Sequence, residues 1–141
     1  MALDIDRSII GREFDHAQFP PVTGDEIRKY AAAAGETNPR YTAASDAEIV
    51  APPTFVVSLR GHHFMPKELF AIGRNGFDAG KDIEFGAPVR VGDVLTTSNT
   101  IHDIYEKTGR SGTMHFIVLR ALITNHRGET VATIDQKMMF R

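Results

Sequence analysis

The stretch PPTFVVSLRGHHFM, residues 52–65, decides how this chain folds. Pro53 suits the first position of a helix, because its fixed φ is already helical and its missing N–H has no partner there anyway. The apolar residues that follow are spread around the helical projection, which indicates burial on several sides. We therefore predict a buried central helix from Pro53 to about Met65, weakened in its middle by Gly61.

The sequence after this helix has the pattern of β-strands. Apolar and polar residues alternate, and Gly-rich turn signals separate the runs at 92–93, 109–112 and 126–128. Long antiparallel strands after one buried helix predict an α+β domain in which a curved sheet wraps the helix. The predicted strands are 81–85, 94–105, 113–125 and 130–140, and an early strand at about 9–14.

A second helix is predicted before the central one. Thr23 stands three residues before Glu26 in the capping-box relation, and the helical stretch from Asp25 to Ala34 ends at Gly35. Ser45 and Glu48 repeat the spacing over a brief turn.

Composition excludes several classes of protein. The 141 residues contain 42% hydrophobic and 24% charged residues, which is ordinary for a globular domain, and we expect one domain over 1–141. The net charge of −2 shows no basic excess for nucleic acid, and no apolar run is long enough to cross a membrane. The chain has no cysteine, which excludes disulfides and thiolate ligands. We expect a cytoplasmic protein.

Two segments, YAAAAGETNPRY at 30–41 and IVAPPTF at 49–55, carry a recognisable motif. With them the sequence resembles the MaoC-like hydratase and dehydratase family, in particular its N-terminal, non-catalytic dehydratase type. The segment DIEFGAPVRVGD at 82–93 supports the resemblance, which covers nearly the whole chain. It implies the hot-dog fold, a curved antiparallel sheet wrapped around a central α-helix.

In active members of this family the motif reads Gly-Asp-x-Asn-Pro-x-His. The resemblance implies that its Asp and His activate a water that adds across an α,β-unsaturated acyl thioester. This chain has Glu36 and Tyr41 at those positions. A phenol with an ordinary pKa of about 10 is a poor base at neutral pH. The family also implies a backbone N–H donor at the start of the central helix, where this chain has Pro53, which has no N–H.

Each of these positions also has an explanation without chemistry. Glu36 fits a solvated loop carboxylate as well as a site residue, and Tyr41 fits a packed aromatic side chain. Asn38-Pro39 is a common turn pair whatever the function. The substrate-binding positions that the resemblance implies are Asn38, Pro53, Thr54 and Phe55.

The other polar residues near the central helix give a weaker indication of function than the motif does. Of His62 and His63, one should face the core or an interface and the other solvent. Arg60 either pairs with Glu36, reaches the thioester carrier or is simply solvated. The spacing of the other histidines does not fit metal ligands, and no phosphate loop or dinucleotide fingerprint occurs. We therefore predict neither a metal nor a cofactor.

The three departures from the motif predict a non-catalytic, substrate-holding subunit of an (R)-specific enoyl-thioester hydratase or 3-hydroxyacyl-thioester dehydratase. The resemblance implies an acyl chain on coenzyme A or acyl carrier protein, and a catalytic chain of the same fold as partner. The alternative is a self-sufficient homodimeric hydratase or a hot-dog thioesterase that uses Glu36. A third possibility is an acyl-thioester binding or regulatory module. Because a small hot-dog sheet leaves an edge open, we expect a homodimer or heterodimer.

Overall fold

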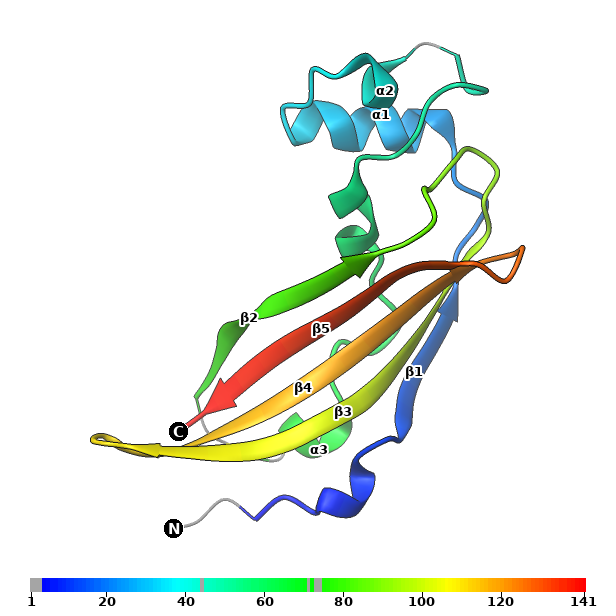
Figure 1. Ribbon diagram of the computed structural model, residues 1–141. Coiled ribbons are helices and arrows are strands. Elements are labelled where there is room, and N and C mark those ends of the chain that lie inside the picture. Colours follow the sequence, from blue (N-terminus) through cyan, green and yellow to red (C-terminus); the bar gives the residue numbers. More distant parts are fainter. Residues whose placement is uncertain (1–3, 44, 71, 73–74) are drawn as a thin grey trace.

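A computed structural model shows one antiparallel sheet with short helices on one face and at one end (Figure 1). It describes residues 4–43, 45–70, 72 and 75–141. The sheet order is β1-β3-β4-β5-β2, and every neighbouring pair is antiparallel. The strands are β1 (Glu13–Gln18), β2 (Gly76–Phe85), β3 (Leu95–Gly109), β4 (Gly112–Asn125) and β5 (Thr130–Phe140). This confirms the predicted α+β class with a curved antiparallel sheet.

The strand boundaries follow the turn signals of the second half closely. β3 and β4 meet at the predicted turn, where Gly112 has a φ of 112° that a side chain would disfavour. The prediction for β5 was correct at both ends. The early strand begins later than predicted, because residues 7–9 form a short 3-10 helix, η1 (Arg7–Ile9), whose start is capped by the Asp6 side chain. β2 begins earlier than predicted, at Gly76.

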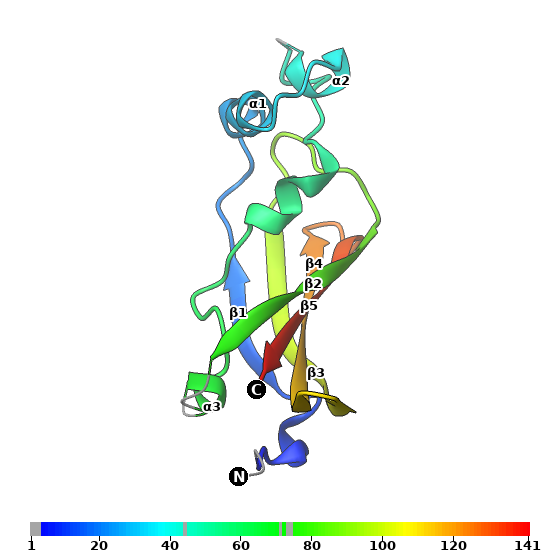
Figure 2. The ribbon, with the colours of Figure 1, turned by 90° about the vertical axis from the view of Figure 1, so that its left-hand side faces the viewer.

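Two helices lie beyond one end of the sheet (Figures 1 and 2). In α1 (Gly24–Ala33), the Thr23 side chain accepts a hydrogen bond from the Glu26 N–H at 3.2 Å. Gly35 follows with a φ of 73°, so both predicted ends of this helix are confirmed within a residue. The second helix, α2 (Pro39–Thr42), is a single turn that begins at the Asn38-Pro39 pair.

The prediction of a central α-helix from Pro53 to Met65 was wrong in type and length. The segment in the hollow of the sheet is a 3-10 helix, η2 (Pro53–Ser58), and the chain leaves it at Leu59 in an extended conformation (Figure 2). Beyond it, the His63 N–H donates to the buried Asp15 side chain rather than to a helical carbonyl. One more helical turn, α3 (Lys67–Phe70), follows. Contacts with the sheet therefore override the helical pattern after Ser58.

The core divides into two clusters along the sheet. The larger one packs η2 and α1 against β3, β4 and β5, with Ile27, Ile49, Leu95 and Ile123 fully buried. The smaller one packs η1 and α3 against the far ends of β3, β4 and β5. The hollow between them is where a ligand could lie.

An ion pair between the half-exposed Arg127 and the buried Asp93 joins the turn from β4 to β5 to the turn before β3. Asp93 is 2% exposed, and it accepts hydrogen bonds from Arg127 at 2.8 Å and from the Arg90 N–H at 3.0 Å. Burial alone would raise the pKa of Asp93, but these two donors outweigh it and hold the pKa below its ordinary value. The folded chain thus keeps this carboxylate ionised to a lower pH than the unfolded chain does.

We expect Asp93→Asn to lower the free energy of unfolding at neutral pH by roughly 1–3 kcal/mol, because the buried charge-assisted hydrogen bonds from Arg127 and the Arg90 N–H become weaker neutral ones, although Arg127 keeps its pair with Glu129. The contribution of a carboxylate with a lowered pKa is complete above its unfolded pKa of about 4 and is lost as pH falls through the folded value. Urea unfolding from pH 7 to pH 3 should therefore show the difference from wild type shrinking below about pH 4.

The matched control is Asp82→Asn, which removes an exposed carboxylate that pairs with Lys137. It should change stability by less than about 1 kcal/mol. An Asp93→Asn chain as stable as the control at pH 7 would contradict the role given to this pair.

Candidate functional site

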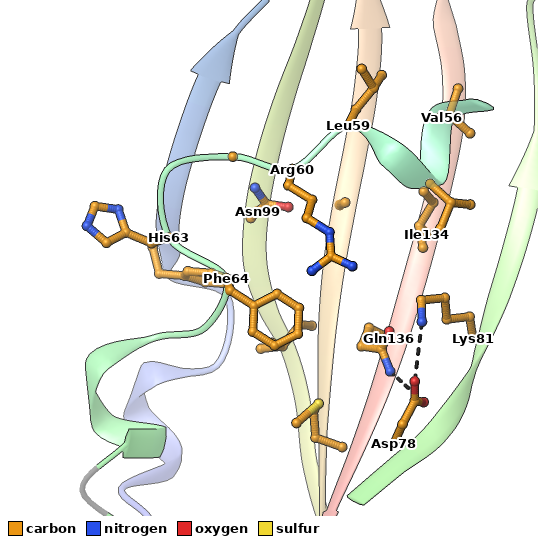
Figure 3. Close-up of a pocket in the computed structure, with 16 residues that line it drawn as sticks. Val56, Leu59, Arg60, His63, Phe64, Asp78, Lys81, Asn99, Ile134 and Gln136 are labelled. Atoms are coloured by element: carbon orange, nitrogen blue, oxygen red, sulfur yellow. Dashed lines mark hydrogen bonds and ion pairs between the residues drawn. The ribbon is translucent and has the colours of Figure 1, made fainter. Parts of the chain in front are cut away.

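A cavity of about 290 Å³ lies between the segment 56–64 and the inner face of the sheet (Figure 3). Most of its wall is apolar and comes from η2, the loop after it, and the middle of β4 and β5. These apolar residues are Val56, Leu59, Leu119, Ala121, Ile134 and Met138. Such a wall suits a hydrocarbon chain.

One side of this cavity is polar. Asp78 of β2 accepts hydrogen bonds from the Gly80 N–H and the Gln136 side chain, both at 2.8 Å, and Lys81 lies 3.4 Å away. These hydrogen bonds lower the pKa of Asp78, and the one from the Gly80 N–H has a larger effect than the one from Gln136. Opposite them, Arg60 extends from the loop into the cavity, with its guanidinium 5.5 Å from the centre of the Phe64 ring (Figure 3).

The loop that bears Arg60 is held against the sheet by Asp15 of β1. The Asp15 side chain is 2% exposed and accepts from the His63 N–H at 3.2 Å and the Asn99 side chain at 3.1 Å. His63 Nδ1 also lies 3.2 Å from this carboxylate. Gly61 passes so close that a Cβ there would overlap Asp15 Oδ2. The loop therefore sits in one position for steric and polar reasons together.

A second cavity of about 260 Å³ adjoins the other side of η2 and brings together two of the predicted site residues. Tyr41 and Pro53 both line it, beside Pro52 and the start of the segment after β2. Val56 contributes to both cavities. The sequence placed Tyr41 and Pro53 at one site, and the fold puts them on one cavity wall.

Glu36 lies elsewhere. It follows Gly35 after α1, it is half-buried, and it lines neither of these two cavities. Its N–H closes the helix end by donating to the Ala31 carbonyl at 2.9 Å. No hydrogen bond or ion pair to its carboxylate comes from the residues that the structure describes. A catalytic role for Glu36 together with Tyr41 stays a prediction.

The other predicted binding positions have structural partners. The Asn38 side chain accepts from the Arg40 N–H at 3.0 Å and caps α2. The Tyr30 hydroxyl lies 2.9 Å from Thr54 Oγ1, and the Tyr30 ring meets Phe55 edge-on, with 5.6 Å between centroids. Phe55 is 5% exposed in the larger core cluster. These contacts fix the position of η2, and a direct role in binding stays a prediction.

The two histidines of the loop are both exposed. We predicted that one of them faces the core or an interface; neither faces the core, and the interface alternative stays a prediction. The His63 ring points away from the cavity (Figure 3). Across the described ranges, no three acidic or histidine side chains gather into a cluster that could hold a metal.

The sequence did not indicate Asp15, Asn99 or Gln136 as site residues. Asp15 and Asn99 face each other across the β1–β3 ladder, and Gln136 reaches Asp78 across the β2–β5 ladder. In the sequence, they could have been identified only as polar residues at strand positions whose side chains face the inside of the sheet.

Comparison with known proteins agrees with this fold. Residues 8–134 match the family described as "FAS1-like, dehydratase domain region". A curated UPF0336 protein of Streptomyces coelicolor is 29% identical over 97% of this chain and 95% of its own length, and one of Thermobifida fusca is 28% identical over 97% and 94%.

Two Mycobacterium tuberculosis structures have the same hot-dog fold. A chain of the HadBC (3R-hydroxyacyl-ACP dehydratase) complex superposes with a TM-score of 0.70 at 24% identity, covering 96% of this chain and all of that one. A chain of the ChsH1–ChsH2 complex superposes with a TM-score of 0.73 at 20% identity, covering 92% and 84%. Within the described residues, no helix has the length and hydropathy needed to cross a bilayer.

We expect Gly61→Ala to lower the free energy of unfolding by roughly 1–3 kcal/mol, because the new methyl group displaces the buried Asp15 carboxylate from its donors. The double variant Gly61→Ala/Asp15→Ala should lose less stability than the sum of the losses in the two single variants, since both substitutions break the same contacts. Denaturant unfolding of the two single variants and the double variant measures this.

Gly109→Ala is the matched control, because a Cβ at that glycine meets nothing within 4 Å. It should stay within about 0.5 kcal/mol of wild type. Equal effects at positions 61 and 109 would show that the loop is not held as described.

Proposed function

The chain belongs to the FAS1-like dehydratase-region family, and from this premise we propose that it is a non-catalytic, substrate-holding subunit. The complex would hydrate a trans-2-enoyl thioester or dehydrate a (R)-3-hydroxyacyl thioester carried on coenzyme A or acyl carrier protein. The protein partner would be a hydratase-fold chain with an intact Gly-Asp-x-Asn-Pro-x-His motif. The single observation that carries the proposal is the wall of the second cavity.

That wall lacks the groups that the reaction needs. At the start of η2 both Pro52 and Pro53 lack an N–H, so neither can stabilise the enolate oxygen that develops in the transition state. The nearby aromatic residue is Tyr41, a weak base at neutral pH. The remaining carboxylate of the motif, Glu36, lies off this cavity. Base, base partner and oxyanion donor are thus absent together, which supports a division of labour between two chains.

The first cavity supports the substrate-holding role. It has an apolar wall between η2 and the sheet, and Val56 separates it from the altered motif positions. We propose that an acyl chain bound there extends its thioester end toward the catalytic groups of a partner chain. The proposed role therefore requires a cavity but no chemistry here.

The self-sufficient hydratase or thioesterase that uses Glu36 has less support. A thioesterase on this fold needs a carboxylate near the substrate carbonyl and an open helix N-terminus. The two prolines that begin η2 remove the donors, and Glu36 is separated from that cavity wall. A binding or regulatory module shares every feature of the proposed subunit except the catalytic partner, so co-purification of such a partner separates the two.

The sheet has an edge at which a partner could add. β2 lies at one edge, and nine of its ten residues are exposed, with Phe77 43% and Phe85 48% exposed. A long exposed edge strand of this kind normally pairs with another chain. The two mycobacterial structures are of complexes, ChsH1–ChsH2 and HadBC, which supports a hydratase-fold partner for this chain.

The triple variant Glu36→Asp, Tyr41→His and Pro53→Gly tests the catalytic part of this proposal. Loss of an oxyanion donor costs roughly 10²–10³ in rate and loss of acid–base help roughly 10²–10⁴. The wild-type chain should therefore barely hydrate crotonyl-CoA. The triple variant should gain measurable hydration, and each single variant should not, because the remaining defects still limit the rate.

Fluorescence unfolding of the variants supplies the control, since Pro53→Gly should cost on the order of 1 kcal/mol. Turnover by the pure wild-type chain above about 10 s⁻¹, the median for enzymes, would overturn the proposal. In that case Glu36→Gln should abolish the rate.

We also expect a dimer that forms through β2. Sedimentation at micromolar concentration should show twice the mass of the chain, or one chain paired with a hydratase-fold partner. In hydrogen exchange, the amides of β2 should be slower in the dimer than after dilution to monomer, while the other edge strand, β1, should not change. A monomer at all concentrations, or protection at β1 alone, would contradict this.

A further inference from the structure

Arg60 places a positive charge on the wall of a largely apolar cavity, and this residue is exposed to solvent, as the solvated alternative for it predicts. Its side chain leaves the loop after η2 and points across the hollow toward β5, between the Phe64 ring and Gln136 (Figure 3). Arg60 Cζ lies 5.5 Å from the centroid of the Phe64 ring, a cation–π contact that uses none of the guanidinium N–H groups. A guanidinium has five N–H donors and no acceptor.

Among the described residues, no acidic side chain forms an ion pair with Arg60. Asp78 is the acidic residue that lines the cavity, and its oxygens already accept from the Gly80 N–H, Gln136 and Lys81. Arg60 makes no hydrogen bond or ion pair with the residues that the structure describes. The second cation of the cavity, Lys81, is neutralised by Asp78, whereas Arg60 is not.

This imbalance matters once a ligand fills the cavity. A plain hydrocarbon chain would displace water from the part of the guanidinium that it covers without replacing those hydrogen bonds, which is unfavourable. A carboxylate would restore them, because its two oxygens match two parallel N–H groups of arginine. The apolar residues Leu119, Ile134 and Met138 then accommodate the rest of the chain.

We infer that the cavity binds an apolar chain that carries a carboxylate, and that Arg60 is the residue that binds this carboxylate. The inference takes the location of the chain from the proposed function and adds the chemistry of the ligand. The same chemistry has two sources, a free fatty acid or an acyl thioester with a second carboxylate at its far end. In both, the charge that Arg60 meets belongs to the ligand and not to the protein.

Calorimetric titration of the full chain with octanoate and with 1-octanol tests the inference directly. The two probes share their hydrocarbon and differ in charge. We expect wild type to bind octanoate at least about tenfold more tightly than octanol, the gain of a charge-assisted hydrogen bond. Arg60→Met should remove this preference without weakening octanol, and Arg60→Lys should restore only part of it, because an ammonium lacks the planar fork.

The double variant Asp78→Asn/Lys81→Met is the matched control, since it removes the other cation of the same cavity together with the carboxylate that neutralises it. It should keep the preference for octanoate, because the net charge beside Arg60 is unchanged. Loss of the preference in this double variant as well as in Arg60→Met would mean a diffuse charge effect and would overturn the assignment to Arg60. Thermal unfolding of each variant verifies that it is folded.

Two thioesters then distinguish the sources, octanoyl-CoA and the mono-CoA thioester of octanedioic acid. Tighter binding of the second, dependent on Arg60, identifies a thioester with a distal carboxylate. A preference confined to octanoate identifies a free fatty acid. If octanoate and octanol bind equally, the carboxylate inference is overturned while the apolar cavity of the proposed function stands. If no probe or thioester binds, the proposed function fails with it.

Discussion

The arrangement of the ligand cavity depends on one buried carboxylate. Asp15 has almost no access to solvent, and its partners come from the adjacent strand and from the loop after η2. A buried carboxylate without donors is costly, so the loop must stay close enough to supply them. Because Gly61 fits against Asp15 only without a side chain, this contact also decides where the helix-forming pattern stops. The wall that carries Arg60 is a consequence of that position.

The sequence predicted best what depends on neighbouring residues. The capping of α1 by Thr23, its end at Gly35 and the bounds of β5 were all correct, because each follows from local hydrogen bonds or from a regular alternation. The central segment was predicted too long. Residues 59–65 read as helical, but the side chain that accepts the His63 N–H, Asp15, is distant in the sequence, and so is Asn99, which holds Asp15. Such a contact has no local signal.

In the candidate site too, the sequence predicted the residues that belong to a local motif and missed those that only the fold brings together. Tyr41 and Pro53 were recognised from a motif, and the fold places both on one cavity wall. Glu36 comes from the same motif, yet its position after a helix end keeps it away from that wall. The cavity under η2 was not predicted at all, because its polar residues lie on separate strands. Gln136 and Asp78 meet only through the register of β5 with β2.

The two cavities on either side of η2 respond differently to change, and this difference bears on how such a chain evolves. On the motif side, proline at the start of η2 stabilises the helical start by its fixed φ and removes a donor that chemistry would need. On the sheet side, the apolar wall and Arg60, which has no anionic partner among the described residues, depend on contacts outside the motif. If a partner chain supplies the chemistry, as we propose, such a chain can gain stability at the motif-side cavity wall and keep its selectivity at the sheet-side cavity. The positions that still constrain it are then those that hold the loop, Asp15 and Gly61, and not the residues of the motif.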